Sequence, residues 1–249
     1  MNHLDKIKIF KEMIENSKNI MFFTGAGIST NSGIPDYRGP NGMWKVREPV
    51  YFDEFINSDL KKIEYWDYIL EGRKFFRDAK PNRAHYAIVE IEKKDKLLGV
   101  VTQNIDGLHL KAGISKEKLI ELHGNNSKAV CLLCSKLYDI DVVLEDFKNN
   151  RLPPKCFCGG YIKPDVVMFG ESLDIKKLSD AYRMAEDCDL CISVGSSLVV
   201  QPASLIVIRA WEKRKPVVII NIGKTEYDEI ATLKIDDDVE KILSLSVFE

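Results

Sequence analysis

Four cysteines have the spacing of a metal site. They stand as Cys131-x-x-Cys134 and Cys156-x-Cys158, and 21 residues separate the two pairs. Structural zinc is commonly held by two close pairs of thiolates that an intervening hairpin brings together. The second pair is tighter than the usual two-residue spacing, but a Gly-Gly pair follows it and lets the backbone turn around a metal. We predict one structural zinc ion on these four cysteines.

The remaining two cysteines provide an internal comparison. Cys188-x-x-Cys191 has the better local spacing, yet it lies in an apolar run typical of a buried strand, so we assign both residues to the core. The alternative for the other four is that they are unrelated thiols. In the cytoplasm, where thiols stay reduced, a cysteine quartet favours a metal over disulfides.

A glycine-rich loop follows an early apolar run. Residues 20–24 have the pattern of a strand, and Gly25-Ala26-Gly27 comes next, where small residues let backbone N–H groups and a helix N-terminus approach a pyrophosphate. Thr30 replaces the third glycine of the dehydrogenase pattern, and residues 102–104 offer no carboxylate for a ribose. A hydride-transferring dehydrogenase is therefore disfavoured, and a tight turn without a ligand is the alternative.

The loop that follows favours a ligand over an empty turn. Residues 33–39 bring a proline turn, Tyr37 and Arg38 into one polar segment. An arginine can hold a phosphate through several donors, and a tyrosine can cover a ring. The two loops together predict a site for a phosphate-containing ligand.

The composition is that of an ordinary soluble protein. The 249 residues are 45% hydrophobic and 30% charged, enough for one large core or a core with a small module. The net charge of -2 gives no attraction to nucleic acid or anionic lipid. No apolar stretch approaches the roughly 20 residues that span a bilayer, and the chain begins as an amphipathic helix instead of a signal peptide. We expect a cytoplasmic protein with no membrane partner and no direct nucleic-acid binding.

Apolar runs alternate with helical patterns along most of the chain. This alternation predicts an α/β fold with a doubly wound parallel sheet. The expected strands are Ile20–Thr24, Leu97–Thr102, 190–195 and 217–221. The expected helices are 5–16, 59–77, 83–94, 176–186, 202–213 and 238–245.

Two stretches interrupt this alternation. Residues 31–80 are rich in glycine, proline and aromatic residues before they become helical, and residues 124–164 contain the four spaced cysteines. We expect both stretches to leave the sheet and to form one small domain. The large domain would then consist of residues 1–30, 81–123 and 165–249.

Several blocks of the sequence together resemble the sirtuins. They follow the order seen in that family and span nearly the whole chain: GAGIS at 25–29, GIPDYR at 33–38, TQNID at 102–106, HGN at 123–125, the cysteine quartet, FGE at 169–171 and GSSL at 195–198. The resemblance implies a Rossmann-type large domain, a small inserted zinc-ribbon and helical domain, and a cleft between them. It also implies NAD-dependent removal of acyl groups from lysine side chains of proteins or peptides, with nicotinamide and an O-acyl-ADP-ribose as products.

The resemblance assigns catalytic roles to three residues. His123 is implied as the general base, which takes a proton from a ribose hydroxyl after the acyl oxygen has attacked the anomeric carbon, and an imidazole titrates in the pH range that this step needs. Asn104 and Asp106 would orient the nicotinamide ribose and the carboxamide. By contrast, His85 lies in an apolar-periodic helix and is interpreted as structural.

The family's NAD contacts map onto short segments of this chain. The pyrophosphate and nicotinamide end would be lined by Gly25, Ala26, Gly27, Ser29, Thr30, Tyr37 and Arg38. Further contacts around the nicotinamide ribose would come from Gln103, Asn104, Ile105, Asp106 and His123. The adenosine half would be held by Gly195, Ser196, Ser197, Asn221, Asp238 and Val239.

Two segments resemble the strand edges between which the family binds its peptide. An extended substrate would pair with both through its main chain and would place the acyl-lysine in an apolar tunnel. The expected contacts are Val167, Met168, Phe169, Gly170, Glu171, Leu198 and Val199. A plain core strand is the alternative for each segment.

The expected acyl preference depends on one helix. Family members that favour acidic acyl groups share a Tyr-x-x-Arg pair there, and in this chain Trp66 and Ile69 align with that pair, with Tyr65, Tyr68 and Arg73 close in sequence. Without a cation for a succinyl carboxylate, acetyl or longer apolar acyl groups are expected to be favoured.

Two other functions would use the same cofactor pocket. A mono-ADP-ribosyltransferase would pass ADP-ribose to a protein nucleophile, and residues 40–44 resemble branches of the family in which such transfer is discussed. A non-catalytic sensor of NAD or ADP-ribose would be expected to lose the base, whereas His123 is present. The deacylase is therefore the preferred hypothesis.

Overall fold

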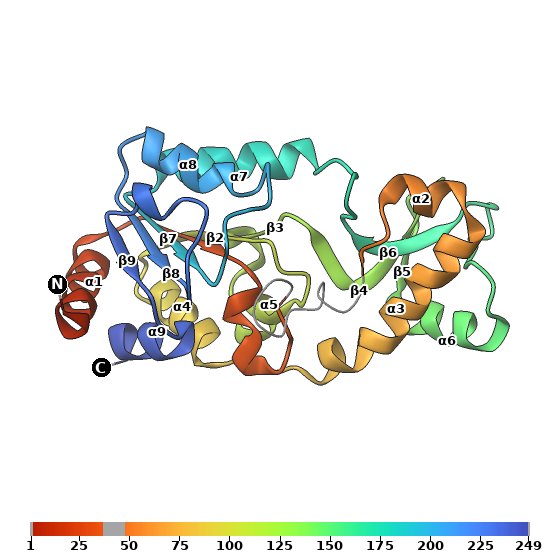
Figure 1. Cartoon of the computed structure of the whole chain (residues 1–249), viewed down its shortest axis with the longest axis horizontal. Coiled ribbons are helices and arrows are strands. Elements are labelled where there is room, and N and C mark those ends of the chain that lie inside the picture. Colours follow the sequence, from red (N-terminus) through yellow and green to blue (C-terminus); the bar gives the residue numbers. More distant parts are fainter. Residues whose placement is uncertain (1, 37–47, 249) are drawn as a thin grey trace.

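The large sheet of the computed structural model is parallel throughout. The structure describes residues 2–36 and 48–248. Six strands have the order β3-β2-β1-β7-β8-β9 (Figure 1). They are β1 (Ile20–Thr24), β2 (Leu97–Thr102), β3 (Leu119–Glu121), β7 (Leu190–Val194), β8 (Val217–Ile220) and β9 (Leu233–Ile235). This is the strand order of Rossmann-type folds, in which the direction of winding reverses at the first strand, here between β1 and β7.

The strands are apolar because helices cover both faces of the sheet. Every residue of β1, β7 and β8 is buried. Strands buried on both faces have continuous apolar runs instead of an alternating pattern. The four predicted strands are confirmed to within one residue. The strands β3 and β9 are not predicted, because each has three residues and gives no periodic pattern.

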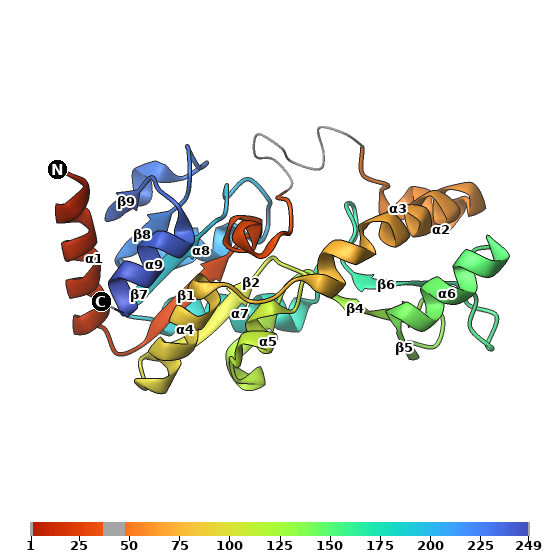
Figure 2. The same cartoon turned by 90° about the horizontal axis from the view of Figure 1, so that it is seen from below.

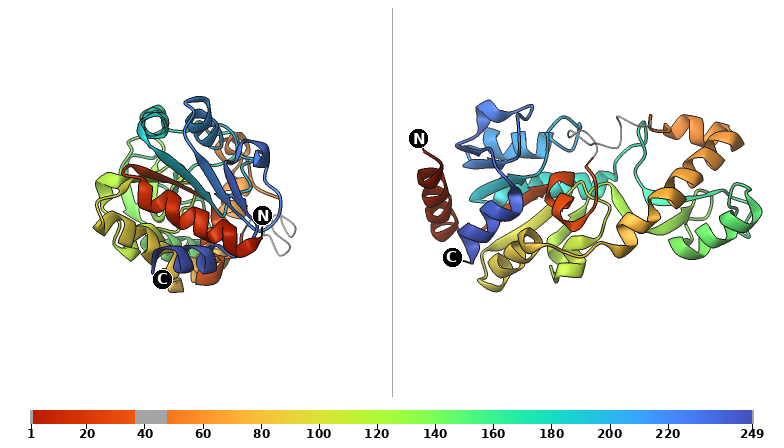
Figure 3. Two further views of the ribbon diagram at one scale, coloured as in Figure 1. Left: turned by 90° about the vertical axis from the view of Figure 1, so that its left-hand side faces the viewer. Right: turned by 60° about the horizontal axis from the view of Figure 1, so that its bottom comes forward.

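Helices lie on both sides of the large sheet, as Figure 1 and Figure 3 show. One face carries α1 (His3–Asn16), α4 (Arg83–Lys93) and α9 (Val239–Val247), and the other carries α7 (Ile175–Asp187) and α8 (Leu205–Glu212). An Asn or Asp side chain caps the N-terminus of each except α8. The predicted helices are confirmed, although residues 201–204 form turns before α8. No helix in the described ranges is long and apolar enough to cross a membrane.

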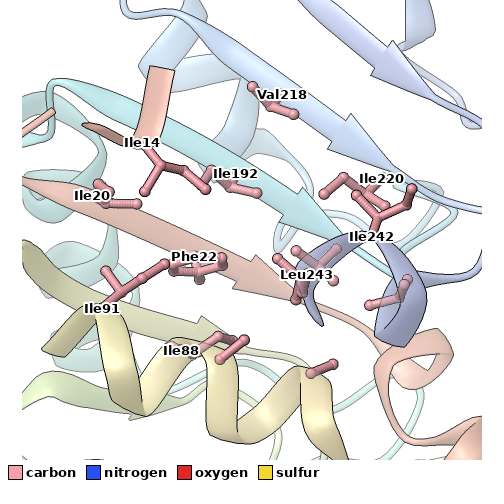
Figure 4. Close-up of a cluster of buried hydrophobic side chains, with 14 of the residues drawn as sticks. Ile14, Ile20, Phe22, Ile88, Ile91, Ile192, Val218, Ile220, Ile242 and Leu243 are labelled. Carbon is pink, nitrogen blue, oxygen red and sulfur yellow. The ribbon is translucent and has the colours of Figure 1, made fainter. Parts of the chain in front are cut away.

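Apolar packing against the sheet stabilises the large domain. In Figure 4, Phe22 and Ile192 of the sheet lie near Ile88 of α4 and Ile242 of α9. All four side chains are fully buried. Complete burial of such a side chain contributes about 1.5–3 kcal/mol. The helices are therefore fixed on the sheet mainly by this apolar contact.

The small domain lies at one end of the molecule (Figure 2). Its antiparallel sheet has the order β5-β4-β6. Its elements are β4 (Gly124–Cys131), β5 (Leu137–Asp139), β6 (Ile162–Val166), α2 (Phe52–Asn57), α3 (Asp59–Asp78) and α6 (Ile140–Asn150). The rings of Trp66 and Phe147 pack in its core with their centroids 6.2 Å apart. Ion pairs between Arg73 and Asp141 and between Arg151 and Asp67 join α3 to the α6 region.

Two histidines are buried in the large domain. His85 on α4 and His109 on α5 (Leu108–Ala112) are 0% and 2% exposed, and their ring centroids are 5.1 Å apart. Burial lowers the pKa of His85 from 6.5 to about 4 and lowers the pKa of His109 well below its usual range. Both rings are therefore neutral in the folded protein at pH 7.

Acidification should destabilise the fold through these rings. Their folded pKa values lie below the unfolded value, so the stabilisation is complete above about pH 6.5 and is lost as the pH falls toward the folded values. For His85 alone the loss at pH 4 amounts to about 3 kcal/mol. Urea denaturation at pH 7, 6 and 5 should show that the free energy of unfolding falls as the pH falls. This fall should be smaller in a His85→Gln variant. A free energy that is constant between pH 7 and 5 would contradict the neutral pair.

Candidate active site

A cleft of about 460 Å³ lies between the two sheets. The loops after β1, β2, β7 and β8 form one side, and the segment after β6 together with α3 forms the other. Ligands of doubly wound sheets bind beyond the carboxyl ends of the strands, where the winding reverses. The predicted site residues that line this cleft are Gly25, Ala26, Gly27, Gln103, Asn104, Ile105, His123, Val167, Met168, Phe169, Gly170, Glu171, Gly195, Ser196, Ser197 and Asn221.

The other predicted site residues lie behind or beside this lining, and Tyr37 and Arg38 fall outside the described residues. Ser29 and Asp106 belong to a polar network behind the loops, Thr30 bonds to a loop carbonyl, Asp238 caps α9, Leu198 and Val239 are buried, and Val199 is exposed. The seven described residues of this group are not part of the cleft lining. Ser29, Thr30 and Asp106 instead bond to the glycine loop or to its neighbours.

Close backbone contact joins the loops after β1 and β7. The N–H of Gly25 donates to the Val194 carbonyl at 3.0 Å, and the N–H of Gly27 donates to the Gly195 carbonyl at 2.8 Å. A Cβ at Gly27 would lie 2.7 Å from the Gly195 Cα, so no side chain fits between the loops. The chain then continues as two 3₁₀ turns, Ala26–Ile28 and Thr30–Ser32, in place of the expected helix N-terminus. The glycine loop is present, but no α-helix begins directly after it in the described residues.

A buried polar network fixes Asn104 behind the glycine loop. Its side-chain amide donates to the Gly25 carbonyl and to Ser29 Oγ, both at 3.2 Å. Ser29 Oγ in turn donates to Asp106 Oδ2 at 2.7 Å. Burial raises the pKa of Asp106, and hydrogen bonds from the Leu108 N–H and from Ser29 partly oppose that rise. The structure thus brings together the glycine loop and two of the three predicted catalytic residues.

His123 stands at the junction of the two sheets, directly before β4. Its Nδ1 lies 2.9 Å from the main-chain oxygen of Gln103. Because a carbonyl only accepts hydrogen bonds, Nδ1 carries the hydrogen and Nε2 keeps a lone pair. Burial lowers the pKa of His123, and the hydrogen bond to Gln103 offsets part of that shift. A neutral ring with an unprotonated Nε2 is the form that accepts a proton at neutral pH.

Polar side chains after β2, β7 and β8 line the far part of the cleft. Gln103 Nε2 donates to Ser196 Oγ at 2.8 Å, which links the loops after β2 and β7. Asn221 follows β8, and its amide donates to the Ile222 carbonyl at 2.8 Å. These residues can hydrogen-bond to hydroxyl groups of a ligand.

The segment after β6 is bonded to both domains. The N–H of Val167 donates to the His123 carbonyl at 2.9 Å, and the Phe169 carbonyl accepts from the Phe52 N–H at 2.8 Å. The rings of Tyr51 and Phe169 also contact each other, with their centroids 5.8 Å apart. The position of this cleft wall is therefore tied to the position of His123.

A partly buried ion pair holds the same segment. Lys163 is 4% exposed, donates to the Val166 carbonyl at 2.7 Å and pairs with Glu171 at 3.1 Å. The Glu171 carboxylate also accepts from the Met168 N–H at 2.9 Å. Glu171, predicted as a peptide contact, thus also closes the turn that carries the other predicted contacts.

One face of α3 lines the cleft opposite the large sheet. Tyr65, Tyr68 and Ile69 belong to this lining, but Trp66 does not. Trp66 is fully buried in the small domain, where its Nε1 donates to the Ile162 carbonyl at 3.3 Å. The alignment of Trp66 with a lining position is therefore wrong, because the small-domain core takes this side chain. Arg73 points to Asp141, with Nη2 and Oδ2 2.7 Å apart.

The four spaced cysteines meet at the far end of the small domain. Their sulfur atoms all lie within 4.8 Å of one another, with Cys131 and Cys158 at 3.5 Å and Cys134 and Cys156 at 3.7 Å. A tetrahedron with zinc–sulfur bonds of about 2.3 Å has edges of about 3.8 Å. The Cys158 N–H lowers the pKa of Cys156 to about 6, which favours the thiolate. The residues fit a four-coordinate zinc ion.

The third cysteine pair behaves as predicted. Cys188 and Cys191 are fully buried, and burial raises the pKa of both thiols, to about 11 for Cys188. Neither residue belongs to the cysteine group that the structure gathers. Both are core thiols.

Some lining residues are absent from the prediction. The segment 48–50, Phe76, Leu173, Ile222 and Lys224 all line the cleft. Most are apolar, and their sequence pattern is that of ordinary core or loop residues. Lys224 lies three residues after the predicted Asn221, so its proximity to a site residue is the only indication in the sequence.

Comparison with known proteins identifies a family. The model of the Sir2 family matches residues 25–202. An NAD-dependent protein deacetylase from Sulfurisphaera tokodaii is 45% identical over 234 residues, which are 93% of this chain and 91% of that protein. An enzyme of the same name from Thermotoga maritima is 41% identical and covers 94% of each chain.

Solved structures agree with these sequence relatives. A Sir2 structure with a deacetylated p53 peptide and 3'-O-acetyl ADP ribose has a TM-score of 0.90 at 37% identity and covers 96% of each chain. A Sir2 structure with a p53 peptide and NAD has a TM-score of 0.87 at 37% identity and covers 95% of each chain. The fold described above is therefore shared along nearly the entire length.

Removing one cysteine ligand should release the metal. Four thiolates complete the coordination of zinc, so Cys131→Ser and Cys156→Ser should each lose the ion and lower the melting temperature. The matched control is Cys188→Ser, which should keep about one zinc per chain because Cys188 lies in the other domain. Metal content by elemental analysis and thermal melting decide the point, and loss of zinc in the control would show that the wrong pair was chosen.

Proposed function

Because this chain belongs to the Sir2 family, we propose that it is an NAD-dependent protein deacetylase that removes acyl groups from lysine side chains. The products would be nicotinamide and an O-acyl-ADP-ribose. The observation that carries the proposal is His123, whose ring lines the cleft in the proton-accepting form, beside Asn104 and the glycine loop. A structural zinc ion on the four cysteines accompanies this activity.

The cleft would hold NAD along the carboxyl ends of the large sheet. The glycine loop would contact the pyrophosphate through the backbone of Ala26, while Gly25 and Gly27 hold this loop by donating their N–H groups to the end of β7 and the residue after it. Ser196 and Asn221 would contact the adenosine half. Asn104, Asp106 and Gln103 would orient the nicotinamide ribose and the carboxamide. The described lining fits this ligand, since the strand ends carry neutral polar groups. Tyr37 and Arg38 are proposed to complete the pyrophosphate and nicotinamide end, with Ser29 and Thr30 as supports.

NAD, when bound, supplies the anomeric carbon and nicotinamide as the leaving group. His123 would then take a proton from a ribose hydroxyl at Nε2, because Nδ1–H is already engaged by the Gln103 carbonyl. Its lowered pKa keeps the ring neutral at pH 7 and so ready to accept that proton. Asn104 lines the same cleft and would hold the ribose in place before the proton transfer.

The protein substrate would bind as an extended strand along the segment after β6. Val167, Met168, Phe169, Gly170 and Glu171 lie on one side, and Leu198 and Val199 would supply the opposite edge through their backbone. Main-chain pairing gives affinity with little dependence on peptide sequence. The acyl chain would then reach toward Ile69, Tyr65 and Tyr68 on α3.

The domain boundaries and the location in the cell follow from the same assignment. Residues 31–80 and 124–164 would form the small domain, and residues 1–30, 81–123 and 165–249 the large domain. Cysteines that hold zinc as thiolates need a reducing compartment, which supports the cytoplasm. Acyl-lysine proteins or peptides are the proposed partners.

Two alternatives use the same pocket. A mono-ADP-ribosyltransferase would leave ADP-ribose on a protein and form no O-acyl-ADP-ribose. A sensor of NAD or ADP-ribose would need no base, yet His123 is oriented by a hydrogen bond that leaves its Nε2 as a proton acceptor. This orientation favours the deacetylase over the sensor, and formation of O-acyl-ADP-ribose distinguishes the deacetylase from the transferase.

Loss of the base should abolish most turnover while NAD still binds. His123→Ala should lower the rate by about 10²–10⁴-fold, the usual contribution of a general base. The measurement is mass spectrometry of an acetyl-lysine peptide incubated with and without NAD, and NAD affinity is measured by titration. His3→Ala is the control, because His3 is exposed, pairs with Asp237 and is not among the residues that line the cleft. If His123→Ala kept more than half of the wild-type activity, His123 would not be the general base.

Acyl selectivity should follow charge. Among the described lining residues the only lysine or arginine is Lys224, which follows β8, and Arg73 is engaged by Asp141. A succinyl carboxylate near Ile69 would therefore lose water without gaining a cation, which costs several kcal/mol. On one peptide with acetyl, butyryl, myristoyl or succinyl lysine, the succinyl form should react slowest by at least about tenfold, equivalent to roughly 1.4 kcal/mol. Equal or faster succinyl turnover would mean that a cation reaches the acyl site.

A further inference from the structure

A row of buried polar side chains lies behind the cleft. Thr24 Oγ1 is 2.9 Å from His109 Nε2 and 2.8 Å from Thr102 Oγ1. Thr102 Oγ1 also accepts the Asn104 N–H at 3.0 Å. Thr24, Thr102 and His109 are each no more than 2% exposed. The row therefore joins a buried histidine, which the proposed chemistry does not use, to the backbone of a site residue.

The neighbouring histidine packs against His109, with the two ring centroids 5.1 Å apart. Its Nδ1 lies 3.3 Å from the Asn82 main-chain nitrogen, as in a capping box at the start of α4, and 3.1 Å from the acceptor Asn82 Oδ1. The buried His85 Nε2 and His109 Nδ1 have no hydrogen-bond partner among the described residues. One of these two nitrogens can carry a hydrogen and the other a lone pair, so the two rings complement each other directly or through one water.

Hydrogen bonds satisfy the row in either of two directions. With its hydrogen on Nε2, His109 donates to Thr24, and Thr24 donates to Thr102. With the hydrogen on Nδ1, Thr102 donates to Thr24, and Thr24 donates to His109 Nε2. Thr102 Oγ1 accepts from the Asn104 N–H in both arrangements. His109 Nε2 is therefore bonded to Thr24 in both arrangements.

The segment that the row holds is the one that orients the base. Between Thr102 and Asn104 lies Gln103, whose N–H donates to the Thr24 carbonyl at 2.9 Å. The carbonyl of Gln103 accepts from His123 Nδ1. A shift of this segment would therefore move both the Asn104 amide and the hydrogen bond that sets the His123 tautomer.

We propose that His109 is a positioning residue that acts through Thr24 and Thr102 on residues 103–104. This inference rests on the proposed function, because His123 and Asn104 serve in it as site residues. It assigns a role in the reaction to a buried histidine that would otherwise be a plain core residue. Small displacements of catalytic groups lower the rate by large factors. We therefore expect that a change in the row lowers kcat.

The kinetic test removes one hydroxyl in the row. Thr102→Val keeps the shape of the side chain but offers no acceptor to the Asn104 N–H, and kcat for an acetyl-lysine peptide should fall at least about tenfold with KM changed less than about threefold. Thr102→Ser keeps the hydroxyl and should retain most of the activity. Ser193→Ala is the matched control, because Ser193 Oγ is buried on the neighbouring sheet strand β7 without a hydrogen-bond partner in the described residues. Activity of Thr102→Val equal to that of Thr102→Ser would overturn the proposal.

A second measurement does not depend on activity or on folding of the variant. Nitrogen-15 NMR of the wild-type imidazoles at pH 7 should show His85 and His109 both neutral, with His109 in a single tautomer because its Nε2 is bonded to Thr24. A charged His109, or a His109 that averages between its two tautomers, would overturn the proposal. If the wild type proves inactive on acetyl-lysine peptides with NAD, the proposed function fails, and the row is then judged by this spectrum and by faster amide exchange at residues 103–104 in Thr102→Val.

Discussion

The contact between the backbones after β1 and β7 is the constraint on which the cleft depends. Two N–H groups of the glycine loop donate to carbonyls at the end of β7, and a Cβ at Gly27 would come within 2.7 Å of Gly195. Because Gly27 and Gly195 have no side chains, the ends of β1 and β7 can meet, and this part of the cleft is lined by backbone. Ser29 follows in the same loop and holds Asn104 and Asp106. A larger residue in this contact would therefore displace the polar network as well as the loop.

The position of His123 is linked to both walls of the cleft. Its ring is bonded to Gln103 after β2, and its own carbonyl accepts from Val167 at the start of the segment after β6. The same segment accepts a hydrogen bond from Phe52 of the small domain through the Phe169 carbonyl. Lys163 and Glu171 stiffen this wall through a partly buried ion pair. Movement of the small domain would therefore displace the segment that is bonded to His123.

The sequence predicts most of the sheet and the metal site, because each has a local pattern. Continuous apolar runs mark the central strands, and close cysteine pairs mark the zinc ribbon. The face that α3 turns to the cleft cannot be predicted in this way, since Tyr65, Trp66, Tyr68 and Ile69 are all large and apolar or aromatic. Docking against Phe147 and Ile162 decides which of them is buried. The polar row from His109 to Asn104 is equally hidden, because Thr24, which links His109 to Thr102, is far away in sequence and meets them only when β1 and β2 pair.

Distance explains how one small domain serves both the metal and the cleft. Strand β4 starts at Gly124, next to His123, and ends at Cys131, a metal ligand. Eight residues of strand span roughly 20 Å, so the cysteine cluster lies far from the base. The pairing of β4 with β6 is irregular between Gly124 and Ala129, which separates the regular ribbon at the metal from the crossing at the cleft. The metal can therefore order the ribbon and the helices packed on it, while the chemistry depends on the strand ends of the large sheet and on His123.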